Sequence, residues 1–328
     1  MLRKLSSMLL PLLLVFLSQA LPCGAQEKLK LRISSATKTL GYGPLWIATK
    51  MGFFDRQGLA VDLVVIRSSD VGIQALAGGS LDIAGSSADA PVAAVEKGLD
   101  LVMIGGIING LTQSIMAAKK FKSYGDLRGA TFGAISLTSG VTFALKHVLK
   151  VKGLEYPRDY KLLVIGGSPQ TYAALTAGQI DAAALSLPLN YAAEEAGFND
   201  IGRFVDVIPN YQLAALSLKR SWGEKNRPVV VRFMKAMAQT MHWIYLNKEP
   251  AVDFLSKEMN LKRDHARRGW EFYTGSRMWH PDGDLNVEGL QVVAQIYAEQ
   301  TQAKTPVPNA AKYVDQSYLR EALKELGK

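Results

Sequence analysis

The chain has 328 residues, of which 48% are hydrophobic and 20% charged, and its formal net charge is +9 at pH 7. This composition is typical of a folded protein with a sizeable core, and the length exceeds that of one ordinary domain. The basic residues are dispersed and lack the interleaved aromatic side chains of a nucleic-acid surface, so we expect no nucleic-acid partner.

The N-terminal residues 1–25 have the three parts of a secretory signal peptide. A positively charged start precedes an apolar run over residues 8–17, which is shorter than the roughly 20 apolar residues that span a bilayer. Small residues before Gln26 indicate cleavage after Ala25, and cleavage after Ala20 is the second candidate. We therefore expect an exported protein of the periplasm.

Cys23 is the only cysteine of the chain and lies within this N-terminal segment. Lipid modification of Cys23 would anchor the protein to a membrane, but Pro22 directly before it argues against a lipoprotein. If cleavage follows Ala25, the mature chain has no thiol. The lack of a thiol excludes disulfides, thiolate metal sites and a cysteine nucleophile.

The mature chain begins with strands and helices in alternation. A strand over residues 31–34 leads into a polar, glycine-rich loop that contains Ser35, Lys38 and Tyr42. A proline-initiated helix over residues 45–51 follows, and an apolar strand comes next. Strands that alternate with helices of this length predict an α/β architecture.

One pattern of helix, turn and strand occurs twice along the chain. Residues 75–84 and residues 174–183 share a leucine, a glycine and an aspartate in the same register. The distance between the copies is too long for a solenoid repeat, so the pattern predicts two similar α/β lobes. Asp82 and Asp181 precede the strands of the two copies. We expect both aspartates to be structural and to lie at the end of each sheet away from the binding site.

Hydroxyl side chains follow the strands of both expected lobes, where new helices begin. They are Ser86 and Ser87 in the first lobe and Thr138, Ser139, Ser168 and Ser186 in the second. A hydroxyl at such a place can cap backbone N–H groups, and the same N–H groups can hold a polar or anionic ligand. Ser168, directly before Pro169, is expected to cap its helix. For every serine the plain capping role stays open, but their convergence on one cleft predicts a ligand site.

The chain after residue 220 has a helical pattern. Residues 228–246 form a long amphipathic stretch, and a turn at 282–286 precedes a helix over 287–299. The aromatic cluster over 270–279 is expected mainly to pack these helices. The 4 histidines are scattered, and no motif of a nucleophile, an acid–base pair, a phosphate-binding loop or a metal site occurs. We therefore expect no catalytic residues, no metal and no cofactor.

Three ordered motifs carry a resemblance to a known family. They are Tyr42–Ala48 with Gly52–Phe54, then Leu76–Ile83, then Asp126–Gly133. The chain resembles the periplasmic solute-binding proteins of ABC importers, in the branch of nitrate, sulfonate and taurine binders that includes proteins similar to the thiamine-pyrimidine-precursor synthase. The resemblance implies an α/β, two-lobed periplasmic binding protein fold that is type II-like, with crossing hinge strands and a helical C-terminal part.

The resemblance also implies the lobe boundaries and the partners. The first lobe would comprise residues 26–115 with 213–328, and the second residues 116–212. The partners would be a small-molecule ligand held between the lobes and the permease of an ABC transporter, and we expect the protein to act as a monomer. The loops that would face the cleft carry the candidate ligand-binding residues Ser35, Lys38, Tyr42, Ser86, Ser87, Thr138, Ser139, Ser168 and Ser186.

The first functional hypothesis is a binding protein that captures a small polar or anionic organic molecule, similar to a sulfonate, nitrate, taurine or a pyrimidine, and delivers it to an importer. A strongly anionic ligand would need charge compensation, yet Lys38 is the only cation in a predicted cleft loop, whereas Tyr42 suits a heterocycle. The alternatives are an enzyme of the pyrimidine-precursor-synthase type and a periplasmic sensor that reports its ligand to a partner receptor. The missing nucleophile and the export signal count against the enzyme.

We expect the exported protein to begin at Gln26, because the charged start, the apolar run and Ala25 together form a cleavable signal. Intact-mass analysis of the protein secreted by a bacterial host measures this directly. Retention of residues 1–25, or the mass of a diacylglycerol group on Cys23, would contradict the expectation of a soluble periplasmic protein.

Overall fold

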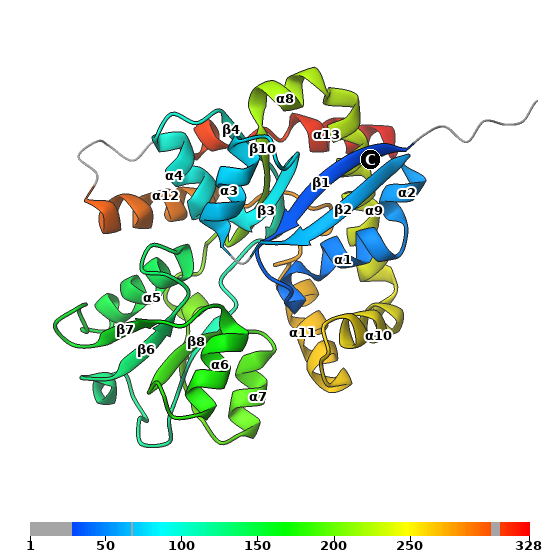
Figure 1. The fold of residues 1–328 in the computed structure, drawn as a ribbon. Coiled ribbons are helices and arrows are strands. Elements are labelled where there is room, and N and C mark those ends of the chain that lie inside the picture. The colour runs from blue at the N-terminus through cyan, green and yellow to red at the C-terminus, as the bar shows by residue number, and fades with distance from the viewer. Residues whose placement is uncertain (1–27, 67, 303–308) are drawn as a thin grey trace, which may run out of the picture.

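The structure, a computed structural model, describes residues 28–66, 68–302 and 309–328. The expected signal peptide, its cleavage site after Ala25 and Cys23 lie outside the described residues. The described chain forms two α/β lobes, each built on one five-stranded sheet (Figure 1). The predicted two-lobed α/β class is therefore confirmed.

The first lobe contains the sheet with the strand order β2-β1-β3-β10-β4. Its strands are β1 (Leu29–Ser35), β2 (Leu59–Val65), β3 (Ile83–Ser87), β4 (Leu101–Ile108) and β10 (Ala214–Lys219). β1 pairs in parallel with β2 and β3, whereas β10 is antiparallel to β3 and β4. β4 is buried along its whole length, which fits its apolar sequence and a sheet covered on both faces.

The second lobe contains the sheet with the strand order β7-β6-β8-β5-β9. Its strands are β5 (Gln113–Ala117), β6 (Thr131–Ala134), β7 (Lys161–Val164), β8 (Ala182–Ser186) and β9 (Asn199–Arg203). β6 pairs in parallel with β7 and β8, whereas β5 is antiparallel to β8 and β9. The two sheets therefore have the same topology.

The chain crosses between the lobes twice, from β4 to β5 and from β9 back to β10 (Figure 1). In each sheet the antiparallel strand is the one that follows a crossing, and it lies fourth in the strand order. The predicted crossing strands are therefore confirmed. Such connections are the places where a hinge can bend. The expected lobe boundary at residue 115 falls inside β5.

Helices cover the sheets and form most of the C-terminal part of the chain. Before β9 they are α1 (Gly43–Lys50), α2 (Phe53–Arg56), α3 (Ser69–Ala77), α4 (Asp89–Glu96), α5 (Gly140–Val151), α6 (Ser168–Thr176) and α7 (Leu189–Glu195). After β9 they are α8 (Arg220–Lys225), α9 (Arg227–Leu246), α10 (Lys248–Glu258), α11 (Arg263–Gly275), α12 (Val287–Thr301) and α13 (Ser317–Glu325). The helices from α8 onward complete the first lobe.

The C-terminal helices pack as the sequence predicted. α9 buries an apolar face, and its Phe233 stacks on Phe54 of α2 with ring centroids 5.1 Å apart. Such a pair contributes about 0.5–1.5 kcal/mol beyond the area it buries. Tyr273 and Trp279 of the aromatic cluster are buried and stack at 4.6 Å, and Asn286 caps α12.

The internal repeat is visible in single hydrogen bonds. Asp82 accepts a bond from the backbone N–H of Arg32 (2.7 Å), and Asp181 accepts one from the backbone N–H of Thr131 (3.0 Å). Both residues of the second-lobe bond are numbered 99 higher than their counterparts in the first lobe, 181 against 82 and 131 against 32. Both carboxylates precede a strand and bind the neighbouring strand, β1 or β6. The structural role that the sequence predicted for these two aspartates is confirmed.

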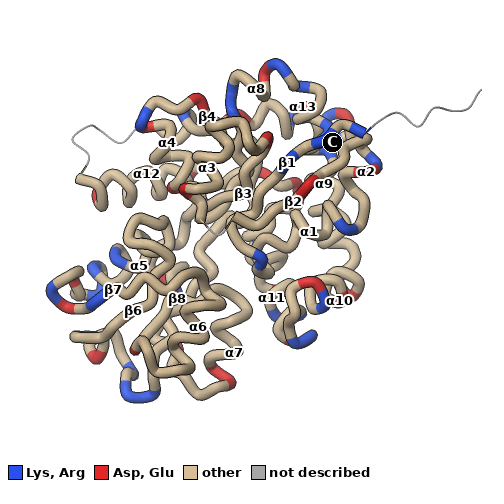
Figure 2. Tube along the Cα trace, in the orientation of Figure 1, with Lys and Arg blue, Asp and Glu red and all other residues tan. Residues whose placement is uncertain are grey.

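Charged residues of both signs are scattered along the chain in both lobes (Figure 2). Many of them form exposed ion pairs, such as Lys235 with Glu325 at 2.9 Å, and such pairs contribute little stability individually. In the described part of the chain, no helix combines the length and the apolar character that crossing a membrane requires.

Replacing Asp82 with alanine removes the acceptor of the Arg32 N–H and an ion pair with its guanidinium at 3.1 Å. We expect the free energy of unfolding to fall by about 0.5–2 kcal/mol, as for a lost cap or turn bond. Ligand affinity of the folded protein should not change, because Asp82 lies at the amino end of the sheet. Chemical denaturation and calorimetric titration measure the two effects.

Asp62→Ala is the matched control, because Asp62 is an exposed acid on the neighbouring strand β2. Its unfolding free energy should stay close to that of the wild-type chain. An Asp82→Ala variant with unchanged stability and lost ligand affinity would contradict the position assigned to this carboxylate.

Candidate functional site

The carboxyl ends of the parallel strands in the two lobes face each other across one junction (Figure 1). The loops after β1 and β3 belong to the first lobe, and the loops after β6 and β8 belong to the second. Ligands of open α/β sheets bind outside the carboxyl ends of the strands, and junctions between lobes are favoured pocket positions. The junction of these four loops, called the cleft below, is therefore the candidate site.

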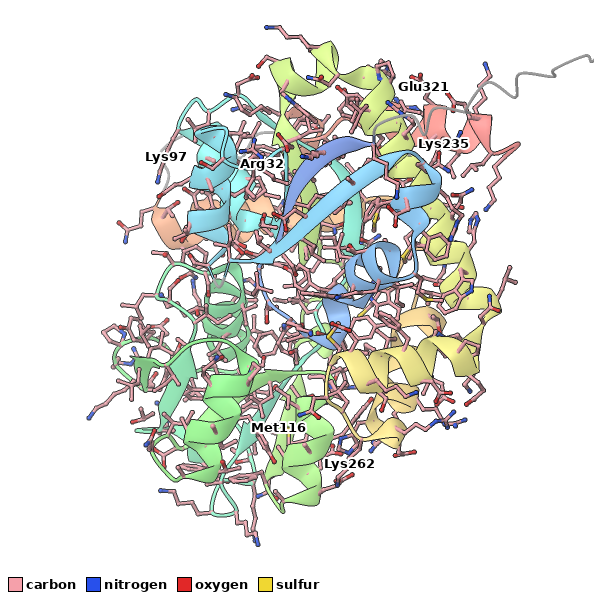
Figure 3. All side chains as sticks on the ribbon, turned by 45° about the vertical axis from the view of Figure 1, so that its right-hand side comes forward. Arg32, Lys97, Met116, Lys235, Lys262 and Glu321 are labelled. Atoms are coloured by element: carbon pink, nitrogen blue, oxygen red, sulfur yellow. The ribbon has the colours of Figure 1, made fainter. Side chains whose placement is uncertain are left out.

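Two sets of contacts between the lobes flank the cleft. Where α7 meets α11, Glu195 pairs with Lys262 (2.7 Å) and His265 (2.6 Å), and Figure 3 shows Lys262 at this junction. Hydrogen bonds from Lys262 and His265 hold the pKa of Glu195 at about 2. Where α5 meets α12, the rings of Phe143 and Tyr297 lie 6.3 Å apart. The structure therefore describes the lobes in mutual contact.

The loop after β1 carries three predicted site residues with different surroundings. Ser35 is buried and donates to the backbone oxygen of Thr37 (2.8 Å), so its hydroxyl is used within the loop. Lys38 pairs with Glu258 of α10 at 2.7 Å, which neutralises its charge within the first lobe. Tyr42 is buried, and burial raises the pKa of its phenol above the ordinary value.

The loop after β3 does not cap its helix with a hydroxyl. β3 continues to Ser87, and Ala88 precedes α4 without a side-chain bond, so the prediction that Ser86 or Ser87 caps this helix is wrong. The Ser86 hydroxyl is buried and has no hydrogen-bond partner among the described residues. Ser87 instead places its N–H and its hydroxyl 3.0 and 2.9 Å from the hydroxyl oxygen of Ser69.

The second lobe repeats this pair of serines. Ser186 places its N–H and its hydroxyl 3.2 and 3.0 Å from the hydroxyl oxygen of Ser168. Gly167 occupies the cap position of α6, so the prediction that Ser168 caps this helix is wrong, although Pro169 does lie in its first turn. In each lobe the pair ties the end of a strand to the start of the preceding helix. The serine pairs are therefore part of the shared fold.

The loop after β6 starts α5 at the cleft. Ser139 caps α5 by accepting a hydrogen bond from the backbone N–H of Thr142 (3.3 Å), which is the plain capping role that the sequence left open. Thr138 is exposed, and its hydroxyl lies 3.5 Å from that of Ser136. Gly140 follows the cap as the first residue of α5.

Asp89, which the sequence reasoning did not select, bridges the two lobes in the cleft. It is the first residue of α4, and only 6% of its surface is exposed. Its carboxyl packs against Gly140, where an added Cβ would lie 2.6 Å from the Asp89 Cγ, and the Gly140 backbone hydrogen bonds with it. A comparison of the two copies of the repeat could have pointed to Asp89, because the copies differ here and the equivalent residue of the second lobe is Pro188.

The electrostatic environment of Asp89 is unfavourable for a charge. Burial raises the pKa of Asp89 to about 6, and the charge of Asp70 on α3 acts in the same direction, whereas hydrogen bonds from the Ser87 hydroxyl and the backbone lower it. Tyr42 and Tyr211 lie close enough for the Asp89 charge to raise their own pKa values, after burial as the main cause. Within the described ranges, no lysine, arginine or histidine contributes to the pKa of Asp89.

A cavity of about 330 Å³ lies between the lobes beside β5. Its wall includes Gln113 of β5, Asn190 of α7 and Phe272 of α11. The Asn190 side-chain oxygen is buried and has no hydrogen-bond partner in the described part of the chain, so it is available to a ligand donor. Over residues 28–66, 68–302 and 309–328, no group of three His, Cys, Asp or Glu side chains could hold a metal ion.

The residue before Asp89 is hydrogen bonded to the crossing between β9 and β10. The backbone N–H of Ala88 donates to the oxygen of Leu213 (3.0 Å), directly before β10. The neighbouring Gln212 is fully buried, donates to the oxygen of Ile108 (3.2 Å) and accepts from the N–H of Asn286 (2.7 Å). A rotation at this crossing therefore changes the position of Asp89 relative to α5.

The profile of the NMT1/THI5-like family matches residues 41–251. A curated relative, the formylaminopyrimidine-binding protein of Halalkalibacterium halodurans, is 25% identical over 217 residues, which are 64% of this chain and 64% of the relative. The match covers the second sheet, the first sheet except β1, and the helices up to the start of α10.

Solved structures share the fold. The periplasmic nitrate-binding protein NrtA of Synechocystis PCC 6803 has a TM-score of 0.73 at 14% identity, over 92% of this chain and 89% of that chain. The alkanesulfonate-binding protein SsuA of Xanthomonas axonopodis pv. citri, bound to MOPS, has a TM-score of 0.70 at 19% identity, over 88% and 99%. At these identities the likeness concerns the fold alone.

We expect Gly140→Ala to open the cleft, because the added Cβ would overlap the carboxyl of Asp89 while a helix start accepts alanine readily. The radius of gyration measured by small-angle scattering should rise relative to the wild-type chain. Gly275→Ala is the matched control, because a Cβ there meets no atom within 4 Å. A Gly140→Ala variant as compact as the wild type would contradict the contact between Asp89 and α5.

Proposed function

Because the chain belongs to the NMT1/THI5-like family, we propose that it is an extracytoplasmic solute-binding protein. It captures a small polar organic molecule between its lobes and delivers the molecule to the permease of an ABC importer. The observation that carries the proposal is the meeting of four strand-to-helix loops, two from each lobe, around one cleft. The formylaminopyrimidine-binding relative and the nitrate- and alkanesulfonate-binding structures support it.

Binding and lobe closure are coupled in this proposal. The two lobes, the second of which contains all of β5, rotate about the two crossing connections. A ligand that touches both lobes binds only the closed state and shifts the equilibrium toward it. The pairs of Glu195 with Lys262 and His265 form only when the lobes meet, and the exposed pair with Lys262 contributes little. The ligand therefore supplies most of the energy of closure.

The proposed ligand contacts combine predicted residues with residues that the fold brings together. Tyr42 lies beside Asp89, and Ser86 has a buried hydroxyl without a described partner. Asn190 adds an amide from the second lobe. Anions similar to a sulfonate or nitrate and heterocycles similar to a pyrimidine are the two ligand classes that the sequence suggested.

We propose a role in binding and not in catalysis. The chain has no recognisable nucleophile or acid–base pair, and its relatives named above are binding proteins. Native mass spectrometry of the purified protein tests the proposal, since a retained small molecule has a measurable mass. A molecule that the protein converts chemically would favour the enzyme, and a loss of uptake on deletion of the protein separates import from sensing.

For a retained molecule supplied at 100 times its Kd, we expect the free energy of unfolding to rise by about 2.7 kcal/mol, because the ligand binds the folded state alone. The radius of gyration should fall in the same titration, since binding requires closure. Thermal unfolding and small-angle scattering measure the two changes. Tight binding without compaction would contradict the closure mechanism.

A further inference from the structure

We infer that Asp89 selects an organic cation, such as a protonated amine or a protonated nitrogen heterocycle, as the ligand of the cleft. The inference rests on the proposed binding function and names its ligand class. A cationic N–H group donates a charge-assisted hydrogen bond to a carboxylate and balances its charge. An anion at the same place would be repelled, and the repulsion is strong where water is excluded.

The first argument is the difference between the two lobes. Both copies contain a serine pair and a strand-binding aspartate, so these groups belong to the shared fold. They are Ser69, Ser87 and Asp82 in the first lobe and Ser168, Ser186 and Asp181 in the second. Two residues after the second serine of each pair, the first lobe has Asp89 and the second lobe has Pro188. The fold can therefore be built without a carboxylate at this position.

The second argument is that the charge of Asp89 has no described partner. Lys38, the cation of the nearest predicted loop, pairs with Glu258 at 2.7 Å. The charged neighbour that acts on Asp89 is another acid, Asp70. Burying an uncompensated charge costs stability, and natural proteins retain such groups at functional sites. A bound cation would compensate both acids.

The third argument is the hydrogen-bonding capacity that Asp89 keeps. A carboxylate has about four acceptor positions on its two oxygens. Three groups hydrogen bond with Asp89: the Ser87 hydroxyl, its own backbone N–H and the backbone N–H of Gly140. Among the described residues, these donors leave the carboxylate with acceptor capacity for a ligand donor. The bond from Gly140 also links the position of the carboxyl to the second lobe.

The fourth argument is the aromatic surroundings of the carboxyl. The charge of Asp89 acts on the phenols of Tyr42, Tyr211 and Tyr297, and burial is the main cause that raises the pKa of all three above the ordinary value. Aromatic faces attract cations by about 0.5–2 kcal/mol in general. Neutral phenols within reach of the charge of Asp89, together with the nearby acid Asp70, suit an organic cation better than a sulfonate or nitrate.

The test compares ring compounds of nearly the same shape and different charge with the mature chain. Benzamidine is the cation, benzamide the neutral compound and benzoate the anion; 4-aminopyridine and nitrate add a second cation and a second anion. We expect the cations to raise the Tm and to bind at least tenfold more tightly than benzamide or either anion. Calorimetric titration measures the affinities, and small-angle scattering in the same samples measures compaction.

The matched variants are Asp89→Asn and Asp62→Asn, which remove the same charge from the cleft and from an exposed position on β2. Asp89→Asn should lower the affinity for both cations at least tenfold, whereas Asp62→Asn should change it less than twofold. Arg67 lies outside the described residues, and Arg67→Gln should keep the preference for cations. Loss of that preference in Arg67→Gln would overturn the inference.

A second measurement needs no ligand. The folded state holds the Asp89 proton up to a pKa of about 6, against an ordinary value of 3.8, so ionisation of Asp89 opposes folding as the pH rises through this window. The Tm of the wild-type chain should therefore fall relative to that of Asp89→Asn between about pH 4 and pH 6. Benzamidine at pH 7 should reduce the difference. Equal pH profiles of the two chains would overturn the inference.

The remaining outcomes separate this inference from the proposed function. Anions that bind the wild-type chain and compact it would overturn the role of Asp89 and leave the binding function intact. A panel in which no cation binds, or an Asp89→Asn variant that binds benzoate more tightly than the wild type does, would also overturn it. Cations that bind through Asp89 without compaction would support the inference and contradict the closure on which the proposed function depends.

Discussion

Each sheet of this protein is completed by a strand that follows a crossing from the other lobe. β5 lies between β8 and β9, and β10 lies between β3 and β4. Without these strands, two neighbours in each sheet would expose unpaired backbone groups, which is costly inside a fold. The two connections therefore have to form, and they restrict the lobes to rotation about a short hinge. This restriction keeps the four cleft loops opposite one another.

The two lobes use the same local devices for the same physical tasks. An aspartate fixes the neighbouring strand at the amino end of each sheet, and a serine pair ties the carboxyl end to a helix start. These groups are satisfied within their own lobe, so they have little left to offer a ligand. The residues that we propose for function lie instead where the copies differ, at the buried Asp89 and at Asn190, whose side-chain oxygen has no described partner.

Charge has different effects at the rim and at the centre of the cleft. Glu195, Lys262 and the pairs like them are partly exposed, so water and salt weaken their attraction. Asp89 is buried, so its field acts over a longer range and with less screening. The rim pairs can stabilise the closed state only slightly, whereas the role that we propose for the central carboxyl is to discriminate between ligands of opposite charge.

Local sequence pattern was sufficient for the α/β class, the two lobes, the long helix α9 and the structural role of Asp82 and Asp181, because periodicity and turn residues act over a few neighbouring positions. The crossing strands were expected only from the family resemblance. Local pattern was not sufficient for the partners of the cleft residues. Lys38 forms an ion pair with Glu258, and Ser87 hydrogen bonds with Ser69, both within the first lobe. Asp89 contacts Gly140, and of these three contacts only this one joins the lobes. A hydroxyl or a charge is equally able to bond to its own lobe or to a ligand, so the path of the backbone through three dimensions decides which partner lies within reach.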